Sequence, residues 1–236
     1  MQNKTSKYFK YAIGEIVLVI IGILIALQIN NWNQNRISKI ELNQSLNKLL
    51  VELNSDLLDL EDKIDLNDKI IKNLDSSLLI LKELANFSVK DFEDKFHYIN
   101  YTSTFNFNRV TFNEISNSGK LKQLNNTVLS DSLINYYSQS LYKVVEEALV
   151  HHVRSNIRTH TLGFDYLDFK DELETYKASD FNIKKKTLKE YRGDVRILNA
   201  IRLKILLHRY CKINYKSIIP RTKYLIKIVE KELENN

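Results

Sequence analysis

The chain has 236 residues, of which 44% are hydrophobic, and a formal net charge of +6. This length allows one soluble domain, or two small ones, besides a membrane segment. Five glycines and one proline are too few for the turns of all-β and doubly wound folds, and a single cysteine excludes an internal disulfide and a cysteine-based zinc cluster. The composition therefore predicts an all-α protein.

An apolar segment follows a short N-terminal tail, residues 1–10. From Tyr11 to Ile29 it has a helical length of roughly 28 Å, close to the thickness of a bilayer core. Its strictly apolar part, Ile16 to Leu27, is short enough for a signal peptide. However, no A-x-A cleavage site follows it, and Trp32 provides an interfacial anchor. We predict an uncleaved transmembrane signal anchor at residues 11–31.

Flanking charges set the predicted orientation of this anchor. Lys4, Lys7 and Lys10 precede it, whereas only Arg36 and Lys39 follow at a comparable distance. The positive-inside rule then places the N-terminal tail in the cytoplasm. Residues 32–236 would form a periplasmic helical bundle domain attached to the cytoplasmic (inner) membrane.

Glu15 is an acidic residue near the cytoplasmic end of the apolar segment. One interpretation is that it complements the positive N-terminal end of the helix dipole and pairs with a tail lysine. The other is that it faces a partner helix, because ionisable groups in membranes usually face protein. Gly14 and Gly22 lie eight residues apart on nearly the same face and would allow close helix approach. Gly14, Glu15 and Gly22 are thus candidates for membrane helix packing.

A long amphipathic helix is predicted after the anchor. Apolar residues at alternating steps of four and three form a heptad seam: Leu46, Leu50, Leu53, Leu57, Leu60, Ile64, Ile71, Leu74, Leu78 and Leu81. Further apolar positions widen this stripe, namely Leu49, Leu58, Leu66, Ile70 and Leu79. The width favours a bundle core over an isolated coiled coil. Asn67 interrupts the seam, either to fix register or as a tolerated polar residue.

The middle of the chain contains shorter elements. Residues 86–110 lose the helical period and predict a loop with one short helix. Thr111 and Glu114 have the spacing of a capping box, so a helix is expected at 112–118, docked through Phe112 and Ile115 and ended by Gly119.

Two further helices are expected towards the C-terminus. Thr127 can cap a helix that continues to about residue 160, with one face formed by Leu129, Leu133, Tyr137, Leu141, Val144 and Ala148. An irregular acidic link at 162–180 precedes a helical stretch from about 185 to 233. Gly193 should loosen the start of this stretch, and Pro220 should kink or divide it.

Charge is distributed unevenly along the chain. Residues 33–100 have nine basic and thirteen acidic side chains, whereas residues 181–236 have fifteen and five. The basic C-terminal helices can pair with the acidic long helix inside the bundle. Alternatively, they present a patch to anionic headgroups or a protein partner. No nucleic-acid recognition motif is present, so nucleic acid is not an expected partner.

Two segments resemble a known family. The stretch "KYAIGEIVLVIIGILIALQINNWN" is similar to the start of a large uncharacterised family of single-pass membrane proteins from Gram-negative bacteria. "TFNEISNSGKLKQLNN", followed by "LINYY", is similar to a second region of that family. The resemblance implies that Glu15 belongs to the family motif. It supplies no catalytic residue and no ligand.

No motif for a reaction is found. The sequence lacks GxSxG, P-loop and HExxH patterns, and the adjacent His151 and His152 point to different helix faces. We therefore expect no enzymatic activity, cofactor or metal. The predicted function is a scaffold or adaptor in a cell-envelope complex. Its expected partners are the lipid bilayer, other copies of the chain and other membrane proteins. The alternative is the small subunit of an ion-driven envelope motor, with Glu15 as the membrane carboxylate.

The predicted orientation can be tested with a reporter fused after Asn236. A reporter that is active only in the periplasm should give signal, because the lysines of the tail keep the N-terminus in the cytoplasm. Signal from a cytoplasmic reporter at the same position would reverse the orientation.

Overall fold

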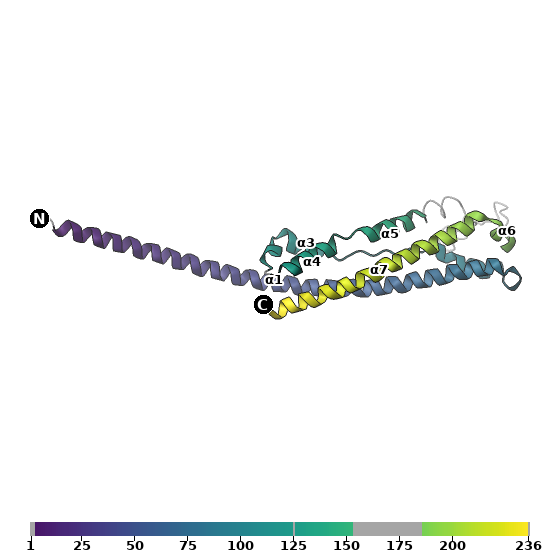
Figure 1. The fold of residues 1–236 in the computed structure, drawn as a ribbon, viewed down its shortest axis with the longest axis horizontal. Coiled ribbons are helices and arrows are strands. Elements are labelled where there is room, and N and C mark those ends of the chain that lie inside the picture. The colour runs from purple at the N-terminus through teal and green to yellow at the C-terminus, as the bar shows by residue number, and fades with distance from the viewer. Residues whose placement is uncertain (1–2, 125, 153–185, 236) are drawn as a thin grey trace, which may run out of the picture.

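A computed structural model describes residues 3–124, 126–152 and 186–235, and within these ranges the secondary structure is helical without a strand. The first helix, α1 (Asn3–Lys82), is the longest, and its N-terminal part extends beyond the rest of the molecule (Figure 1). The all-α prediction is confirmed. The expected membrane and amphipathic helices are parts of this one uninterrupted helix.

Shorter helices follow α1 along the chain. The α-helices are α2 (Val89–Phe96), α3 (Val110–Asn117), α4 (Thr127–Tyr137), α5 (Leu141–His152), α6 (Leu188–Gly193) and α7 (Val195–Asn235). Among the described residues, three 3-10 helices lie in the connections: η1 (Leu84–Asn86), η2 (His97–Asn100) and η3 (Lys120–Gln123). The predicted loop at 86–110 thus contains one complete α-helix, α2, and one complete 3-10 helix, η2.

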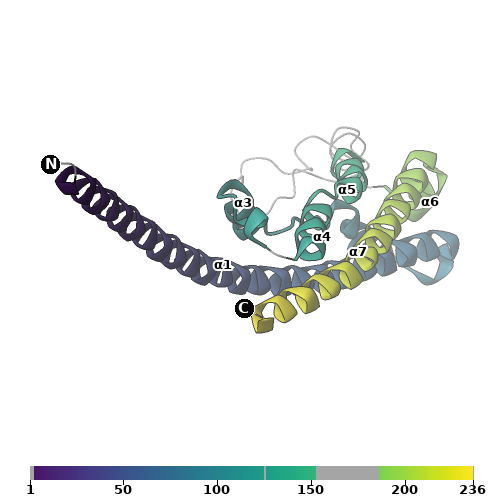
Figure 2. The same ribbon diagram turned by 60° about the vertical axis from the view of Figure 1, so that its left-hand side comes forward.

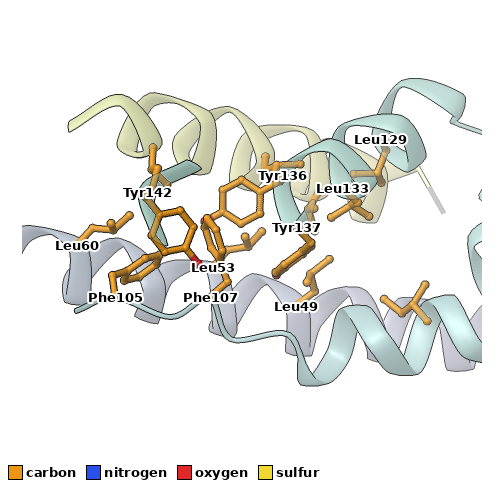
Figure 3. Close-up of a cluster of buried hydrophobic side chains, with 14 of the residues drawn as sticks. Leu49, Leu53, Leu60, Phe105, Phe107, Leu129, Leu133, Tyr136, Tyr137 and Tyr142 are labelled. Carbon is orange, nitrogen blue, oxygen red and sulfur yellow. The ribbon is translucent and has the colours of Figure 1, made fainter. Parts of the chain in front are cut away.

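The bundle is built on the antiparallel pair of α1 and α7. α7 packs along the second half of α1, and its C-terminus points back towards the place where α1 leaves the bundle (Figures 1 and 2). Aromatic side chains fill the space between this pair and α4, as Figure 3 shows. The rings of Phe107 and Tyr136 lie 4.6 Å apart between centroids, and Phe112 stacks on Tyr137 at 4.4 Å.

The expected capping box at the start of α3 is wrong. Thr111 is already inside the helix, and the residue before its first turn, Arg109, makes no side-chain cap. Instead, the backbone N–H and the hydroxyl of Thr111 both donate to the carboxylate of Glu52 on α1, at 3.1 Å and 2.7 Å. Gly119 has a φ of 74°, the left-handed conformation expected after the helix.

The helix predicted from Thr127 is divided into α4 and α5. Asn126 rather than Thr127 is the N-cap, and it accepts from the N–H of Leu129 at 3.1 Å. α4 ends at Tyr137, and α5 begins at Leu141. Because the interruption breaks the helical period, the buried face of α5 is not the predicted one. Val144 and Ala148 are exposed, and the residues buried on α5 are Tyr142, Glu146, Leu149 and His152.

The last predicted stretch is also two helices, α6 and α7, which separate after Gly193. Pro220 lies inside α7 and does not divide it. The predicted acidic link at 162–180 and the predicted continuation of a helix to residue 160 lie outside the described residues.

The predicted seam faces the interior along its whole length. Leu46, Leu53, Leu60 and Leu74 are fully buried, and the remaining seam positions are half-buried or buried: Leu50, Leu57, Ile64, Ile71, Leu78 and Leu81. Of the residues that widen the stripe, Leu49 and Ile70 are buried and Leu66 is half-buried, but Leu58 and Leu79 are exposed.

Leu53 and Leu58 offer a matched pair of leucines on one helix, since Leu53 has no exposed surface and Leu58 is 65% exposed. We predict that Leu53→Asp unfolds the bundle, because an unpaired buried carboxylate costs several kcal/mol, comparable to the stability of a domain. Leu58→Asp should leave the unfolding temperature within a few degrees of wild type. Circular dichroism of the full chain in detergent would measure both. Equal effects of the two substitutions would contradict this assignment of the core.

Candidate functional site

The N-terminal part of α1, outside the bundle, packs against none of the other described elements. Every residue from Ile13 to Trp32 is exposed, including the three packing candidates Gly14, Glu15 and Gly22. A Cβ placed on either glycine would meet no other atom within 4 Å. This helix is long and apolar enough to cross a membrane. None of the described residues packs against the predicted helix-packing face.

Contacts with the bundle begin a short distance after the apolar segment. The hydroxyl of Ser38 donates to Gln123 Oε1 at 2.5 Å, and the Lys120 ammonium lies 3.4 Å from the Glu41 carboxylate. Leu42 is the first buried side chain of α1. Between Ile29 and Ser38 the helix rises by roughly 14 Å. The bundle is therefore connected to the apolar segment by about two and a half turns of the same helix.

The interior of the bundle consists of two apolar clusters. The first contains α1 residues from Leu42 to Leu60 and α7 residues from Cys211 to Val229. The second contains α1 residues from Ile70 to Leu81 and α7 residues from Ile197 to Ile205. Buried polar side chains lie at the boundary between them. We call this boundary the polar layer and define it by Asn67, Ser103, Glu146, His152, Lys204, His208 and Tyr215.

A continuous hydrogen-bond network connects three elements in the polar layer. Asn67 on α1 donates from Nδ2 to the hydroxyl of Ser103 at 3.1 Å, and its Oδ1 accepts from Nδ1 of His208 on α7 at 2.6 Å. Because Nδ1 carries the proton, Nε2 of neutral His208 is an acceptor, and no group among the described residues donates a hydrogen bond to it. Burial lowers the pKa of His208 to about 3, so this imidazole is neutral at pH 7.

Glu146 on α5 closes the other side of the network. Its Oε1 accepts from the backbone N–H of Phe105 at 2.8 Å and from the hydroxyl of Tyr215, whose oxygen also lies 3.2 Å from the carbonyl oxygen of Ser103. Burial raises the pKa of Glu146, and the hydrogen bonds from Tyr215 and Phe105 oppose this shift. The polar layer thereby joins α1, α5, α7 and the segment around Ser103.

Lys204 is the exception in this network. Its side chain is fully buried, and no residue in the described part of the chain forms a hydrogen bond with Nζ. Burial lowers the pKa of Lys204 to about 7. Burial also lowers the pKa values of His208 and His152 nearby, and the charge of Lys204 adds to both shifts. His152 in turn donates from Nε2 to the carbonyl of Ala200 at 3.1 Å. A buried amine without a partner is costly, and strongly shifted pKa values are common at functional sites.

Two carboxylates of α1 hold the segment that enters α3. Glu52 binds Thr111, as described above, and the Asp56 carboxylate accepts from the N–H of Asn108 at 3.0 Å. Burial raises the pKa of Asp56 to about 6. Glu52 thereby satisfies one of the N–H groups that the first turn of α3 leaves without a partner, and Asp56 binds an N–H of the segment just before that helix. Their role is structural, because both accept from the backbone of the same chain.

Neither the clusters nor the network supplies a metal site. Among the described residues, no group of three or more His, Cys, Asp or Glu side chains is arranged to hold a metal ion. His151 is exposed and His152 is buried, in agreement with their predicted placement on different faces. Cys211 is buried, and burial raises the pKa of its thiol to about 12.

The chain was also compared with known proteins. Residues 15–181, more than half of the chain, match a family of unknown function, DUF6090. The protein belongs to this family. Neither the curated proteins nor the solved structures gave a match. The expected membership of an uncharacterised family is thus supported, and the DUF6090 description states neither an activity nor a ligand.

The DUF6090 description names no residue of the polar layer. Of the residues in this layer, the sequence analysis had singled out only Asn67 as an interior polar position. A signal for its three members on α7, Lys204, His208 and Tyr215, was present in the sequence. Ile197, Ile201, Lys204, His208, Cys211 and Tyr215 are separated by steps of four and three and form one helix face. A search for polar residues within such an apolar stripe would have placed Lys204 and His208 in the interior of this DUF6090 member.

We predict that Lys204→Met raises the free energy of unfolding by a few kcal/mol at pH 7. In the wild type, the unfolded chain holds the lysine proton up to about pH 10.5, whereas the folded chain releases it above about pH 7. Wild-type stability therefore falls as the pH decreases from about 10 to about 7, and the advantage of the methionine should shrink as the pH rises.

Chemical denaturation at pH 7 and pH 10 would measure this difference. The matched control is Lys212→Met, because Lys212 is half-buried and pairs with Asp68 at the surface of the same helix. This control should not stabilise the protein. If Lys204→Met is no more stable than wild type at pH 7, the Lys204 ammonium has a partner in solution.

Proposed function

We propose that this DUF6090 member is a non-enzymatic, membrane-anchored scaffold or adaptor in a cell-envelope complex. Its N-terminal tail would lie in the cytoplasm and its helical bundle in the periplasm. The observation that supports the proposal is the continuity of α1, which carries an exposed apolar segment at one end and the core of the bundle at the other.

The exposed segment requires an apolar environment. Twelve large apolar side chains are exposed in this segment: Ile13, Ile16, Val17, Leu18, Val19, Ile20, Ile21, Ile23, Leu24, Ile25, Leu27 and Ile29. Contiguous apolar surface of this kind is rare on soluble monomers and marks a membrane or protein contact. A bilayer would cover all faces of the helix, and a second helix could pack on the face with Gly14 and Gly22.

The continuous helix also fixes where the bundle would stand. The interfacial region of a bilayer adds about 5–8 Å on each side of its hydrocarbon core. The roughly 14 Å between Ile29 and Ser38 would hold the bundle just beyond the headgroups. Such a fixed connection suits a protein that positions partners beside the membrane, and it supports the adaptor over a domain that moves freely on a linker.

The motor alternative depends on Glu15. In a proton-driven motor this carboxylate would bind and release a proton, whereas in an adaptor it would contact lipid headgroups or a partner helix. None of the contacts described for the bundle favours the motor. Substitution of Glu15 separates the two functions.

We predict that Glu15→Gln retains the partners of the wild type, because an amide can still form hydrogen bonds across a helix interface. Glu15→Leu should reduce their recovery if Glu15 faces a partner helix. The proteins that copurify from mild detergent with wild type, Glu15→Gln and Glu15→Leu would be compared by quantitative mass spectrometry, alongside the phenotype of a deletion strain. Complete loss of function in Glu15→Gln with unchanged partners would refute the adaptor and favour the motor, since an amide cannot titrate.

A further inference from the structure

Two buried side chains of the polar layer have unused hydrogen-bonding atoms on neighbouring turns of α7. Lys204 and His208 have no exposed surface, and no described residue forms a hydrogen bond with Nζ of Lys204 or Nε2 of His208. The two residues are four positions apart, so they lie on one face of the helix, about 6 Å apart along its axis. Roughly 90% of buried polar groups in folded proteins bind protein or ordered water. Two exceptions on one helix face therefore require an explanation.

The two atoms have opposite hydrogen-bonding roles. Asn67 sets the role of His208, because its Nδ2 donates to the carbonyl of Lys63 at 2.6 Å and to the hydroxyl of Ser103 at 3.1 Å, which leaves its Oδ1 to face the imidazole. The ring proton is therefore on Nδ1, and Nε2 is an acceptor. Lys204 supplies a donor, since the ammonium and the neutral amine both carry N–H groups. A molecule that binds both atoms must accept one hydrogen bond and donate another.

Water meets this requirement. A halide ion can accept from Lys204 but has no proton to donate to His208, and a metal ion on Nε2 would be repelled by the lysine ammonium. We propose that an ordered water molecule is bound in the polar layer between Lys204 and His208. It accepts a hydrogen bond from Nζ of Lys204 and donates one to Nε2 of His208. The site is independent of the proposed function, because it involves neither the membrane segment nor a partner protein.

A third group is available for the second proton of this water. The carbonyl of Tyr101 lies beside the imidazole, where it raises the pKa of His208 against the larger, opposite effect of burial. This carbonyl cannot bond directly to Nε2 of a neutral ring, since both are acceptors. It can accept from the water instead. With Lys204 and His208 it would give the water three hydrogen bonds, the usual number for a buried water molecule.

The water extends the hydrogen-bond network from Asn67 through His208 to Lys204. It does not remove the cost of burying the lysine charge, because one water molecule replaces only part of the hydration shell of an ammonium ion. Lys204→Met should therefore still stabilise the bundle at pH 7, although it deprives the water of its donor.

Crystal structures of the full chain and of Lys204→Met, at a resolution that shows ordered water, test the proposal. In the wild type, density for one water is expected within hydrogen-bond distance of both nitrogen atoms, about 2.7–3.2 Å. In Lys204→Met this density should be lost, because methionine offers no donor. Lys212→Met is the matched control at the surface of the same helix, and it should retain the water.

Nuclear magnetic resonance of chains with ¹⁵N-labelled histidine makes the same test in solution. The Nε2 signal of His208 should be that of a hydrogen-bonded acceptor in the wild type and in Lys212→Met. In Lys204→Met it should shift towards that of a free acceptor.

Four results would overturn the proposal. The first is a direct contact of about 3.2 Å or less between Nζ and Nε2, which leaves no place for the water. The second is a protonated Nε2 that donates to the carbonyl of Tyr101. The third is water density that persists in Lys204→Met, since other groups would then hold it. The fourth is a His208 signal that is unchanged by Lys204→Met.

Discussion

The hydrogen bond between Asn67 and His208 determines how α7 lies on α1, and the rest of the bundle depends on that register. The two residues are 141 positions apart in sequence, and both are fully buried. A shift of α7 by one turn would leave Oδ1 of Asn67 and Nδ1 of His208 without the bond that joins them, at a cost of about 1–3 kcal/mol for each buried group. Apolar side chains alone discriminate weakly between such shifts, because leucine and isoleucine recur along both helices.

With that register fixed, the two apolar clusters fall on either side of the polar layer. The larger cluster lies nearer to the anchor and receives the aromatic side chains of α4 and of the segment before α3 (Figure 3). The other lies at the far end and receives α2, η2 and α6. Buried polar groups of this kind can favour one arrangement of the helices while lowering the stability of the fold. Lys204 is an example, since its buried amine has no hydrogen-bond partner among the described residues.

The parts of the fold that could be predicted from sequence are those governed by local periodicity. The seam from Leu46 to Leu81 follows from its spacing alone, as does the left-handed Gly119. The errors have a common physical origin in contacts across the fold. Thr111 does not cap its own helix because Glu52, 59 residues earlier, offers a better acceptor. The end of α4 after Tyr137 could not be predicted, since Ser138, Gln139 and Ser140 include no strong helix breaker.

The polar layer escaped sequence analysis for a related reason. Its hydrogen bonds join residues from four separate segments of the chain. Asn67, Lys204 and His208 each lie in a recognisable apolar stripe, but periodicity within one helix does not show which residue of another helix they contact. For the apolar segment, the candidate residues were easy to predict but their contacts were not. Gly14, Glu15 and Gly22 are exposed, and none of the described residues packs against them.

The turns of α7 that give the bundle its register also reduce its stability. His208 accounts for the register through its bond to Asn67. Lys204 lies one turn earlier, and its buried amine has no hydrogen-bond partner among the described residues. Because the folded chain releases the lysine proton at a lower pH than the unfolded chain, this lysine lowers the stability of the bundle most at pH 7 and below. The register and the pH dependence of stability therefore come from neighbouring positions of one helix.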